Sequence, residues 1–544
     1  MPTLEWIGKE KVINHHQEVP FRVLDRQYSF DENGQHAGEK VNCAEGAREA
    51  ALGRNGSENM IIHGDNLDAL KALLPRYEGR VKCIYIDPPY NTGNEGWVYN
   101  DNVNDPKIRK WLGEVVGKEG EDLSRHDKWL CMMYPRLKLL QKLLAEDGAI
   151  FISIDDVEFY NLRLICNEVF GEHNFIATII WRKNYAPKST AKHFSEDHDY
   201  ILVFGKNADN WIPHKMPRTE KQNKAYKNFD NDPRGLWRPN NLAARNYYSK
   251  GTYSIKCPGG RIIEGPPSGS YWRVSEEKFW ELDRDGRIWW GRDGNNVPAP
   301  KIFLSEVSDG IVPQTFWPYE EVGHTQDAKK EIKAIFGGDM PFDTPKPVRL
   351  IERILQIASD PDSIILDSFA GSGTTAHAVL NMNKADGGHR KFILVEMMDY
   401  ADSITAERVK RVIRGHGEGK NAVEGTGGSF SYYELGEPLL IGENLNEAVA
   451  PEKIREYIWF METKTPYTPA AGENLYYLGK HNDTGYYFYY EPQRITVLDY
   501  AFLATITEKT GGTVIYADRC SIDDGKLSQM GIVFKKIPRD ISRL

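Results

Sequence analysis

The stretch Ser363 to Met382, SIILDSFAGSGTTAHAVLNM, contains the strongest indication of the fold. An apolar, β-branched run comes first, a glycine-rich loop follows, and a run with helical spacing completes the stretch. The loop has the pattern Gly-x-Gly-x-x-Ala, with Gly371, Gly373 and Ala376 at the small positions. Glycines let the backbone turn tightly and approach a ligand, and the first turn of the helix offers free N–H groups. We therefore expect a ligand to bind where this strand ends.

The residues around the loop narrow the choice of ligand. The phosphate-loop pattern Gly-x-x-x-x-Gly-Lys-[Ser/Thr] is absent from the sequence, which leaves a dinucleotide or S-adenosylmethionine. Asp367 and Phe369 stand just before the glycines. A carboxylate there would repel a pyrophosphate but attract the ammonium and sulfonium groups of S-adenosylmethionine, so the loop favours the methyl donor. Glu396 ends the run KFILVE, where a carboxylate either binds ribose hydroxyls or is simply solvated.

A second motif, Asp87-Pro88-Pro89-Tyr90, directly follows the β-rich run KCIYI. Open α/β sheets bind ligands at the carboxyl ends of their strands, so we expect the tetrad at the same edge as the glycine loop. The tetrad has the groups needed to methylate an exocyclic base amine. The Asp87 carboxylate and the Pro88 carbonyl can accept its two N–H bonds, the prolines hold the turn rigid, and Tyr90 can stack on the base. Taken alone, the tetrad could instead be a Pro-Pro turn with a surface tyrosine.

Strand-like and helix-like runs alternate on both sides of a long irregular stretch. MIIHGD, VKCIYID, AIFISID, NFIATIIW and DYILVF precede it, and SIILD and KFILVE follow it. This alternation predicts an α/β fold, a doubly wound and mostly parallel sheet built from two separated halves. The expected parts are an N-terminal arm (1–58), the half that carries the tetrad (59–205), an inserted domain (206–338), the half that carries the glycine loop (339–424) and a small C-terminal α/β domain (425–544).

Composition excludes several classes of protein. The chain has 544 residues and a formal net charge of −9, with 40% hydrophobic and 27% charged residues, as is usual for a globular protein of several domains. The sequence has neither a membrane-spanning apolar run nor a signal peptide, so we expect a cytoplasmic protein. The six cysteines lack both the C-x-x-C pattern and zinc-ligand spacing, and no metal site is predicted.

Together the two motifs resemble those of the β class of DNA amino-methyltransferases, and within it the Mod subunits of type III restriction-modification systems. DPPYNTG (87–93) and FAGSGTT (369–375) resemble the catalytic and cofactor motifs, in the circularly permuted order that defines the class. HGDNLDALK, DGAIFISIDD, TPKP (344–347) and FKKIPRDISR resemble the same family. The resemblance covers nearly the full chain and implies a Rossmann-like methyltransferase fold.

The resemblance also implies which residues form the site. The catalytic residues would be Asp87, Pro88, Pro89 and Tyr90. The residues that bind S-adenosylmethionine would be Asp65, Lys346, Asp367, Phe369, Gly371, Gly373, Thr374 and Glu396. Asp65 could instead cap a helix, and Lys346 could be solvated. His377, in the first turn after the loop, is expected to be structural.

In this family the place of the inserted domain is taken by the target-recognition domain. From Arg182 to Lys256 there are 15 Lys and Arg against 7 Asp and Glu, interleaved with Tyr, Trp, Asn and Gln. Such side chains can contact phosphates and base edges, although a solvated mixed surface or, for aromatics such as Trp237, a core position is the alternative. The predicted DNA contacts are Arg182, Lys183, Arg234, Trp237, Arg238 and Arg245. Because the target base must reach Tyr90, a duplex substrate requires base flipping.

The resemblance implies transfer of a methyl group from S-adenosylmethionine to the N6 of adenine in duplex DNA. Asp rather than Ser at position 87 favours adenine by the family pattern, and N4-cytosine methylation remains open. A recognition subunit that serves a partner nuclease is another alternative, and the tetrad and Asp367 disfavour a Rossmann dehydrogenase. The implied partners are double-stranded DNA, a second copy of the chain and a Res helicase-nuclease, with residues 425–544 as the interaction domain and no role for a membrane.

Overall fold

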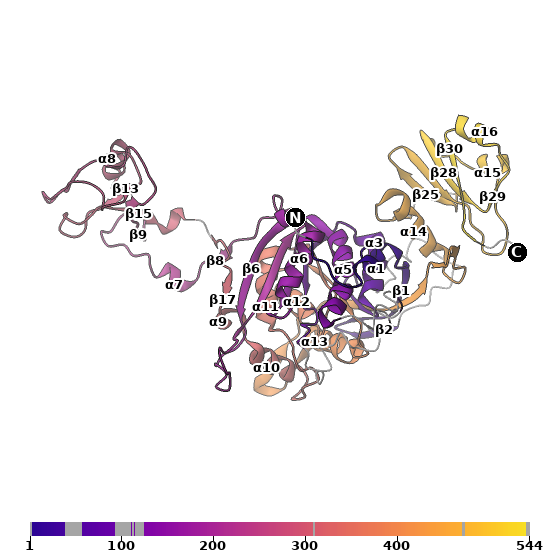
Figure 1. Ribbon diagram of the computed structural model, residues 1–544, viewed down its shortest axis with the longest axis horizontal. Coiled ribbons are helices and arrows are strands. Elements are labelled where there is room, and N and C mark those ends of the chain that lie inside the picture. The colour runs from indigo at the N-terminus through magenta and orange to yellow at the C-terminus, as the bar shows by residue number, and fades with distance from the viewer. Residues whose placement is uncertain are drawn as a thin grey trace. The chain divides into compact units, whose positions relative to one another are not determined.

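The computed structural model describes residues 3–37, 57–92, 110, 114, 124–307, 310–469 and 474–539. The chain forms two compact units (Figure 1), a smaller one of residues 215–313 and a larger one of residues 1–214 and 314–544. The inserted domain predicted at 206–338 thus contains the smaller unit, but its margins belong to the larger one. One reason is that β17 (Phe316–Trp317) pairs in parallel with β6 (Phe175–Arg182) of the main sheet.

In the described part of the chain, an eleven-stranded sheet forms the centre of the larger unit, with the order β17-β6-β7-β5-β4-β18-β19-β3-β22-β1-β2. All neighbours from β5 to β22 are parallel. β7, next to β5, and β1 and β2, at the other end, run antiparallel to their neighbours. The mostly parallel α/β sheet predicted from the sequence is therefore confirmed. The remaining strand bounds are β7 (His198–Gly205), β5 (Leu144–Ile154), β4 (Val81–Ile86), β18 (Ile364–Asp367), β19 (Lys391–Glu396), β3 (Met60–His63), β22 (Ser429–Pro438), β1 (Arg22–Asp31) and β2 (Gly34–Ala37).

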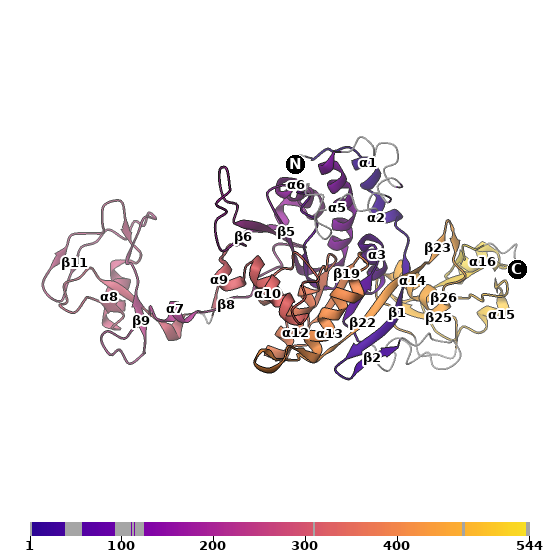
Figure 2. The same cartoon turned by 90° about the horizontal axis from the view of Figure 1, so that it is seen from below.

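Helices cover both faces of this sheet (Figure 2). On one face, α3 (Asn66–Tyr77), α5 (Arg125–Leu143) and α6 (Phe159–Phe170) share a core with alternate strand residues such as Ile84 and Ile86. On the other face lie α11 (Val348–Ala358), α12 (Thr374–Asp386) and α13 (Glu407–Arg414), with α12 in contact with both of the others. Strands buried on both faces have nearly continuous apolar sequences, which is why the sequence predicts them well.

The tetrad and the glycine loop leave the sheet side by side. β4 ends in the tetrad and β18 ends in the glycine loop, and their pairing aligns Cys83 with Ile365 and Ile84 with Leu366. Because the two strands are parallel, both loops emerge at the same edge of the sheet. Motifs almost 300 residues apart in the chain therefore meet at one place.

Four strands of the sheet lie outside the limits predicted from the sequence: β2 in the predicted arm, β17 in the predicted inserted domain, and the longer strands β1 and β22. β1 falls within the predicted arm (1–58), and β22 falls within the predicted C-terminal domain (425–544). β22 pairs with β3 on one side and with β1 on the other. Both strands mix polar with apolar residues, RVLDRQYSFD and SFSYYELGEP, because they are less buried than the central strands. Their pattern is correspondingly weaker in the sequence.

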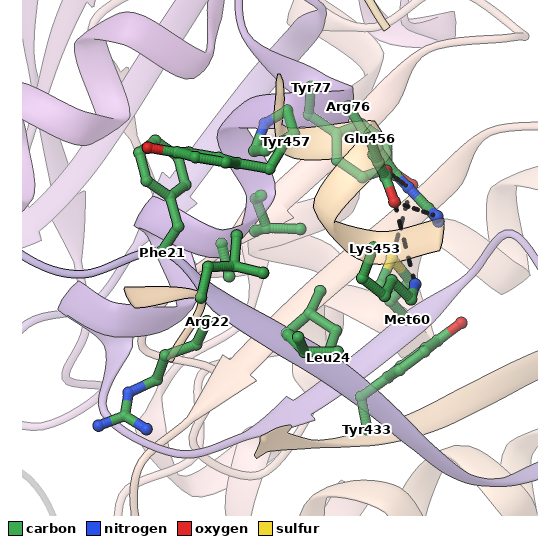
Figure 3. A pocket seen from close by; sticks show the side chains of 15 residues that line it. Phe21, Arg22, Leu24, Met60, Arg76, Tyr77, Tyr433, Lys453, Glu456 and Tyr457 are labelled. Carbon is green, nitrogen blue, oxygen red and sulfur yellow. Dashed lines mark hydrogen bonds and ion pairs between the residues drawn. The ribbon is translucent and has the colours of Figure 1, made fainter. Parts of the chain in front are cut away.

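After β22 the chain forms a small α/β domain with the sheet order β25-β26-β28-β30. Its first helix, α14 (Pro451–Thr463), contacts α3, where Arg76 Nη2 donates to Glu456 Oε2 at 3.1 Å. Figure 3 shows the side chains that line the pocket at this contact, including Phe21 and Tyr457, whose ring centres are 4.9 Å apart. The strands of this domain are β25 (Tyr477–His481), β26 (Thr484–Phe488), β28 (Gly512–Ala517) and β30 (Ile532–Lys536).

The smaller unit has little regular structure. Its longest helix among the described residues is α8 (Glu276–Arg284), and its strands are short, as in the sheet of β14 (Ile288–Trp289), β15 (Ala299–Phe303) and β9 (Trp237–Pro239). An apolar core includes Trp272, Phe279 and Trp290. In neither unit does a described helix have the length and apolar character needed to cross a membrane.

Candidate active site

The two motifs line one pocket at the carboxyl ends of β4 and β18. The walls of the pocket are Tyr85, Asp87, Phe342, Thr344, Pro345, Lys346, Asp367, Phe369, Ala370, Gly371, Ser372, Thr374 and Thr375. The ring of Tyr90 lies beside it, with its centre 5.1 Å from Lys346 Nζ. The structure therefore brings the predicted catalytic residues and most of the predicted cofactor residues together. Tyr85 and Phe342 are wall residues that the sequence analysis missed, because neither stands within a motif.

Asp87 is held by an ion pair and still has one oxygen available. Its Oδ2 pairs with Lys346 Nζ, and both side chains are 11% exposed. Among the described residues, its buried Oδ1 accepts no hydrogen bond of normal geometry. The Tyr90 hydroxyl, which also makes none, lies next to the Asp87 carboxylate. Buried polar atoms without partners are costly. These two atoms are therefore placed to contact a bound molecule.

The turn of the tetrad is fixed from the side of α5 and α6. Trp129 Nε1 donates a 2.7 Å hydrogen bond to the Pro89 carbonyl. Asn91, directly after the tetrad, has a φ of 60° and donates through its amide to the buried carboxylate of Glu158. His126 Nδ1 lies 2.7 Å from the same carboxylate. The sequence analysis missed Trp129 and Glu158, because neither forms part of a recognisable motif.

The glycine loop is held through its backbone. Gly371 and Gly373 have φ values of 52° and 80°, which only glycine adopts readily. The Gly371 N–H donates to Glu396 Oε2 at 2.8 Å, and its carbonyl accepts from Thr405 Oγ1 at 2.6 Å. A Cβ atom on Gly373 would lie only 3.0 Å from the Thr405 carbonyl oxygen. Glu396 thus supports the loop in this structure, and its contact with a ribose stays a prediction.

Carboxyl groups gather around the pocket. Asp367 is buried and accepts from Thr375 Oγ1 at 2.6 Å, and burial, reinforced by the negative charge of Asp87, raises its pKa to about 7. Burial also raises the pKa of Glu396 and that of Asp199, whose carboxylate accepts from Lys183 at 2.5 Å. A ligand that carries positive charge would relieve the repulsion among these groups.

Asp65 lies outside the pocket wall. Its carboxylate caps α3 by accepting from the Leu67 N–H at 2.7 Å, and Arg136 Nη2 donates to it at 3.2 Å. The neighbouring Asn66 donates to the Ser368 carbonyl of the glycine loop at 3.1 Å. The structure thus shows the helix cap that the sequence analysis gave as the alternative, and a contact of Asp65 with the cofactor stays a prediction.

His377 packs behind the loop, 3.3 Å from Arg408 Nη2. Burial, followed by the charge of Arg408, lowers the pKa of His377 well below its usual value. The described residues contain no group of three or more His, Cys, Asp or Glu side chains arranged to hold a metal ion.

The residues predicted to contact DNA fall in both units. Arg182 and Lys183, at the end of β6, belong to the larger unit. Arg182 pairs with Asp197, just before β7, and Lys183 pairs with Asp199 in β7. In the smaller unit Arg238 and Arg245 are exposed. Their contacts with DNA stay predictions.

Two further residues of this set are engaged within the smaller unit. Trp237 is fully buried, and its indole donates to Asp230 Oδ1 at 2.9 Å. Arg234 pairs with Asp232 at 2.9 Å, which holds the pKa of that carboxyl well below its usual range. Trp237 therefore takes the core position that was the alternative for the aromatic residues.

The parallel sheet and its pocket define an α/β protein that binds its ligand at the carboxyl ends of the strands. Residues 81–407, more than half of the chain, match the family described as DNA methylase (N6_N4_Mtase). The chain belongs to this family of DNA methylases.

The chain is also similar to individual proteins. The type III restriction-modification enzyme StyLTI Mod subunit of Salmonella typhimurium strain LT2 is 36% identical over 70% of this chain and 61% of that protein. The type II methyltransferase M.KpnI of Klebsiella pneumoniae is 32% identical over 62% of this chain and 81% of that protein. The solved PvuII DNA methyltransferase (cytosine-N4-specific) is 13% identical over 65% of this chain and 87% of that chain, with a TM-score of 0.34. The chain spans about three fifths of the length of the Mod subunits it matches.

Proposed function

We propose that the chain transfers a methyl group from S-adenosylmethionine to the N6 of adenine in double-stranded DNA. The observation that carries this proposal is the buried Asp87 Oδ1, which accepts no hydrogen bond of normal geometry among the described residues and lies at the pocket beside the hydroxyl of Tyr90. We further propose that the chain is the modification and recognition subunit of a type III restriction-modification system. Its 36% identity to a Mod subunit supports this role.

The residues of the pocket fit S-adenosylmethionine. A Cβ atom on Gly371 would lie 3.2 Å from the Phe342 ring, so glycine keeps the backbone accessible at this point. Phe369, Lys346 and Thr374 would hold the cofactor beside the loop, and the Asp367 carboxylate would favour its positive charge. When bound, S-adenosylmethionine supplies an electrophilic methyl group on a positively charged sulfur.

The protein's own groups would prepare the base amine for attack. The amine is a poor nucleophile because its lone pair is delocalised into the ring. Asp87 Oδ1 and the Pro88 carbonyl would accept its two N–H bonds and localise the lone pair, while Tyr90 stacks on the flipped base. Lys346 and Trp129 hold this arrangement through the ion pair with Asp87 and the hydrogen bond to Pro89. Alignment of the amine with the methyl group then completes the requirements for transfer.

The test is label transfer followed by identification of the modified base. Purified protein is incubated with methyl-labelled S-adenosylmethionine and unmethylated DNA, which is digested to nucleosides for mass spectrometry. We expect N6-methyladenine, reduced about 1,000-fold in Asp87→Ala. Asp147→Ala is the control, because Asp147 is an exposed carboxylate with its own lysine partner, Lys82.

The other outcomes separate the alternatives. N4-methylcytosine would keep the chemistry and contradict the choice of adenine. If the protein binds the cofactor and recognises a DNA site but transfers no label to it, the result would favour a recognition subunit that serves a partner nuclease.

We also propose that the smaller unit binds the target DNA. Arg245 is exposed, whereas Trp237 is in the interior. Arg245→Ala should weaken DNA binding severalfold and reduce its salt dependence without a change in fold, as expected for a phosphate contact. Binding is measured by fluorescence anisotropy at several salt concentrations. An unchanged affinity and salt slope would remove Arg245 from the interface.

Finally, we propose that the C-terminal domain mediates assembly, as a homodimer and with a Res subunit. Its edge strand β30 carries the exposed Val533. Light scattering of the full chain and of Val533→Glu tests this proposal. A monomeric wild-type protein would contradict the homodimer, and an unaffected dimer would place the interface elsewhere. The cytoplasmic location predicted from the sequence stays a prediction.

A further inference from the structure

Behind the glycine loop lies a buried arginine that the proposed chemistry does not use. Arg408 on α13 is 0% exposed, and its Nη1 donates to Ser372 Oγ and Thr374 Oγ1, both at 2.8 Å. In the described part of the chain no carboxylate lies within ion-pair distance of Arg408, although the charge of Glu331 acts on it, and its Nε has no hydrogen-bond partner. Burial lowers the pKa of Arg408 to about 10, so it is still charged at neutral pH. A buried cation that no carboxylate contacts directly calls for an explanation.

Stability alone does not explain this arginine. It lies at the N-terminal end of α12, where the positive end of the helix dipole disfavours another positive charge. Even a buried ion pair can often be replaced with apolar side chains of similar volume without loss of stability, so burial of this charge is not by itself a gain. What the guanidinium adds at this position is hydrogen bonds to the Ser372 and Thr374 hydroxyl groups of the loop.

The guanidinium determines where the proton of the Thr374 hydroxyl points. Arginine has only hydrogen-bond donors, so Thr374 Oγ1 accepts from Arg408 and must direct its own proton to another atom. Two acceptors lie within reach of that proton, the Lys346 carbonyl oxygen at 3.3 Å and Ser372 Oγ at 3.4 Å from Thr374 Oγ1. The carbonyl oxygen is the nearer and the stronger acceptor, and it takes the proton. Arg408 thereby ties the start of α12 to the backbone of Lys346.

Lys346 carries this connection to the catalytic carboxylate. Its Nζ forms the ion pair with Asp87 Oδ2 and leaves Oδ1 for the base amine. The link Arg408–Thr374–Lys346–Asp87 thus runs from a helix on one face of the sheet to the tetrad. We propose that Arg408 is a positioning residue, which fixes the backbone of Lys346 through the Thr374 hydroxyl and so holds Asp87 in its reactive orientation. This inference rests on the proposed methyl transfer.

The first test compares kinetics in matched variants. Arg408→Met and Thr374→Val each break the link, and Arg408→Lys keeps a charged donor. Arg390→Met is the control, because Arg390 is equally buried but pairs with Asp386 at the other end of α12. We expect Arg408→Met and Thr374→Val to lower kcat about tenfold each. KM for the cofactor should change about twofold or less in Arg408→Met, because Arg408 is not part of the pocket wall, whereas Thr374→Val also alters that wall and is judged by kcat.

The pattern among the variants decides the result. The double variant should be no slower than either single variant, because both break one link. Arg408→Lys should recover part of the loss, and Arg390→Met should lower Tm but leave kcat unchanged. Losses that multiply, or an equal loss in Arg390→Met, would overturn the inference. If Arg408→Met does not fold, Thr374→Val decides alone, because it breaks the same link and retains the arginine.

A second readout does not depend on activity. Brief treatment with acetic anhydride and peptide mass spectrometry measure how fast Lys346 is acetylated in the full-length protein. A looser ion pair with Asp87 should raise this rate about threefold or more in Arg408→Met but not in Arg390→Met. An equal rate in both variants would contradict the positioning role. Failure of the proposed function and failure of this inference can be told apart. Wild-type protein that methylates nothing would refute the proposed function, whereas an unchanged acetylation rate of Lys346 in Arg408→Met would refute the positioning role.

Discussion

The two loops of the active site follow adjacent strands of one sheet, yet they are held from opposite faces. On the side of α5 and α6, Trp129 donates to the Pro89 carbonyl, and the buried Glu158 accepts from the residue after the tetrad. On the other side Thr405 of η4 (Ala401–Ala406) and Arg408 of α13 hold the glycine loop. The tetrad is thus held through the Pro89 carbonyl, whereas the glycine loop is held both through its backbone, at Gly371, and through the hydroxyl group of Thr374.

This difference teaches that the two tasks of the site should be separable. Changes on the α5 and α6 side should affect the reaction more than cofactor binding. Changes on the η4 and α13 side should affect cofactor binding, except where Arg408 and Thr374 connect the loop to Lys346. The following predictions test that separation, from the largest expected effect to the smallest.

Gly373→Ala should weaken cofactor binding about 100-fold, because the φ of 80° disfavours alanine and the new Cβ would approach the Thr405 carbonyl to 3.0 Å. Gly387→Ala is the matched control. Gly387 has a φ of 71° at the end of the same helix, but a Cβ atom there would meet nothing within 4 Å. Isothermal titration calorimetry with S-adenosylmethionine measures both. Equal losses in the two variants would show that backbone strain, and not the close contact behind the loop, is responsible.

Tyr90→Ala should reduce kcat about 30-fold through lost stacking on the base, while the Kd for the cofactor stays within about twofold. Tyr90→Phe retains the ring and removes only the hydroxyl, so it should lose severalfold less. Steady-state kinetics with saturating cofactor distinguish the two variants. A large loss of cofactor affinity in Tyr90→Ala would break the separation of the loops.

Cofactor affinity should depend on pH through Asp367, whose pKa is raised by burial to about 7. The pKa of Asp367 is higher in the folded than in the unfolded protein, so the unfolded protein releases this proton first as pH rises. The free energy of unfolding therefore falls between about pH 4 and pH 7. A cationic ligand prefers the ionised carboxylate, so binding should tighten up to about tenfold between pH 6 and 8. Asp367→Asn should flatten the profile. A pH-independent Kd in the wild type would contradict this role.

Trp129→Phe should lower kcat about fivefold, because the Pro89 carbonyl loses one neutral hydrogen bond worth about 1 kcal/mol. Trp181→Phe is the control, since Trp181 is equally buried and donates to the Gly323 carbonyl at 3.0 Å, outside the pocket. Both variants should lose similar thermal stability. The same kcat in both would mean that the indole of Trp129 does not act on the tetrad.

The sequence predicted the centre of the molecule better than its margins. β4 and β18 are buried on both faces, so each is a short apolar run that ends at a motif, and their meeting at one edge followed from the fold class. β1 and β22 are half-buried strands with mixed sequences, and only their pairing across about 400 residues shows that they belong to the sheet. Local pattern cannot show a partner so distant.

The supporting residues of the site show the same limit. Asp87 and Gly373 stand in motifs and could be named from the sequence, whereas Trp129, Glu158 and Arg408 act through atoms of residues far away in the chain. Nothing in their immediate neighbourhood distinguishes them from ordinary core residues. The same ambiguity applied to Trp237, which the structure places in a core.

The pairing of β4 with β18 also has a consequence for biosynthesis. One edge of β4 is covered by a strand that leaves the ribosome roughly 280 residues later, which takes about 15 to 55 s at ordinary elongation rates. Until then the most apolar part of the nascent sheet has an open edge, which exposes it to aggregation. The same gap offers a place to divide the gene. The second fragment would then have to insert β18 and β19 between β4 and β3 of the first fragment, and β22 between β3 and β1, for the sheet to form.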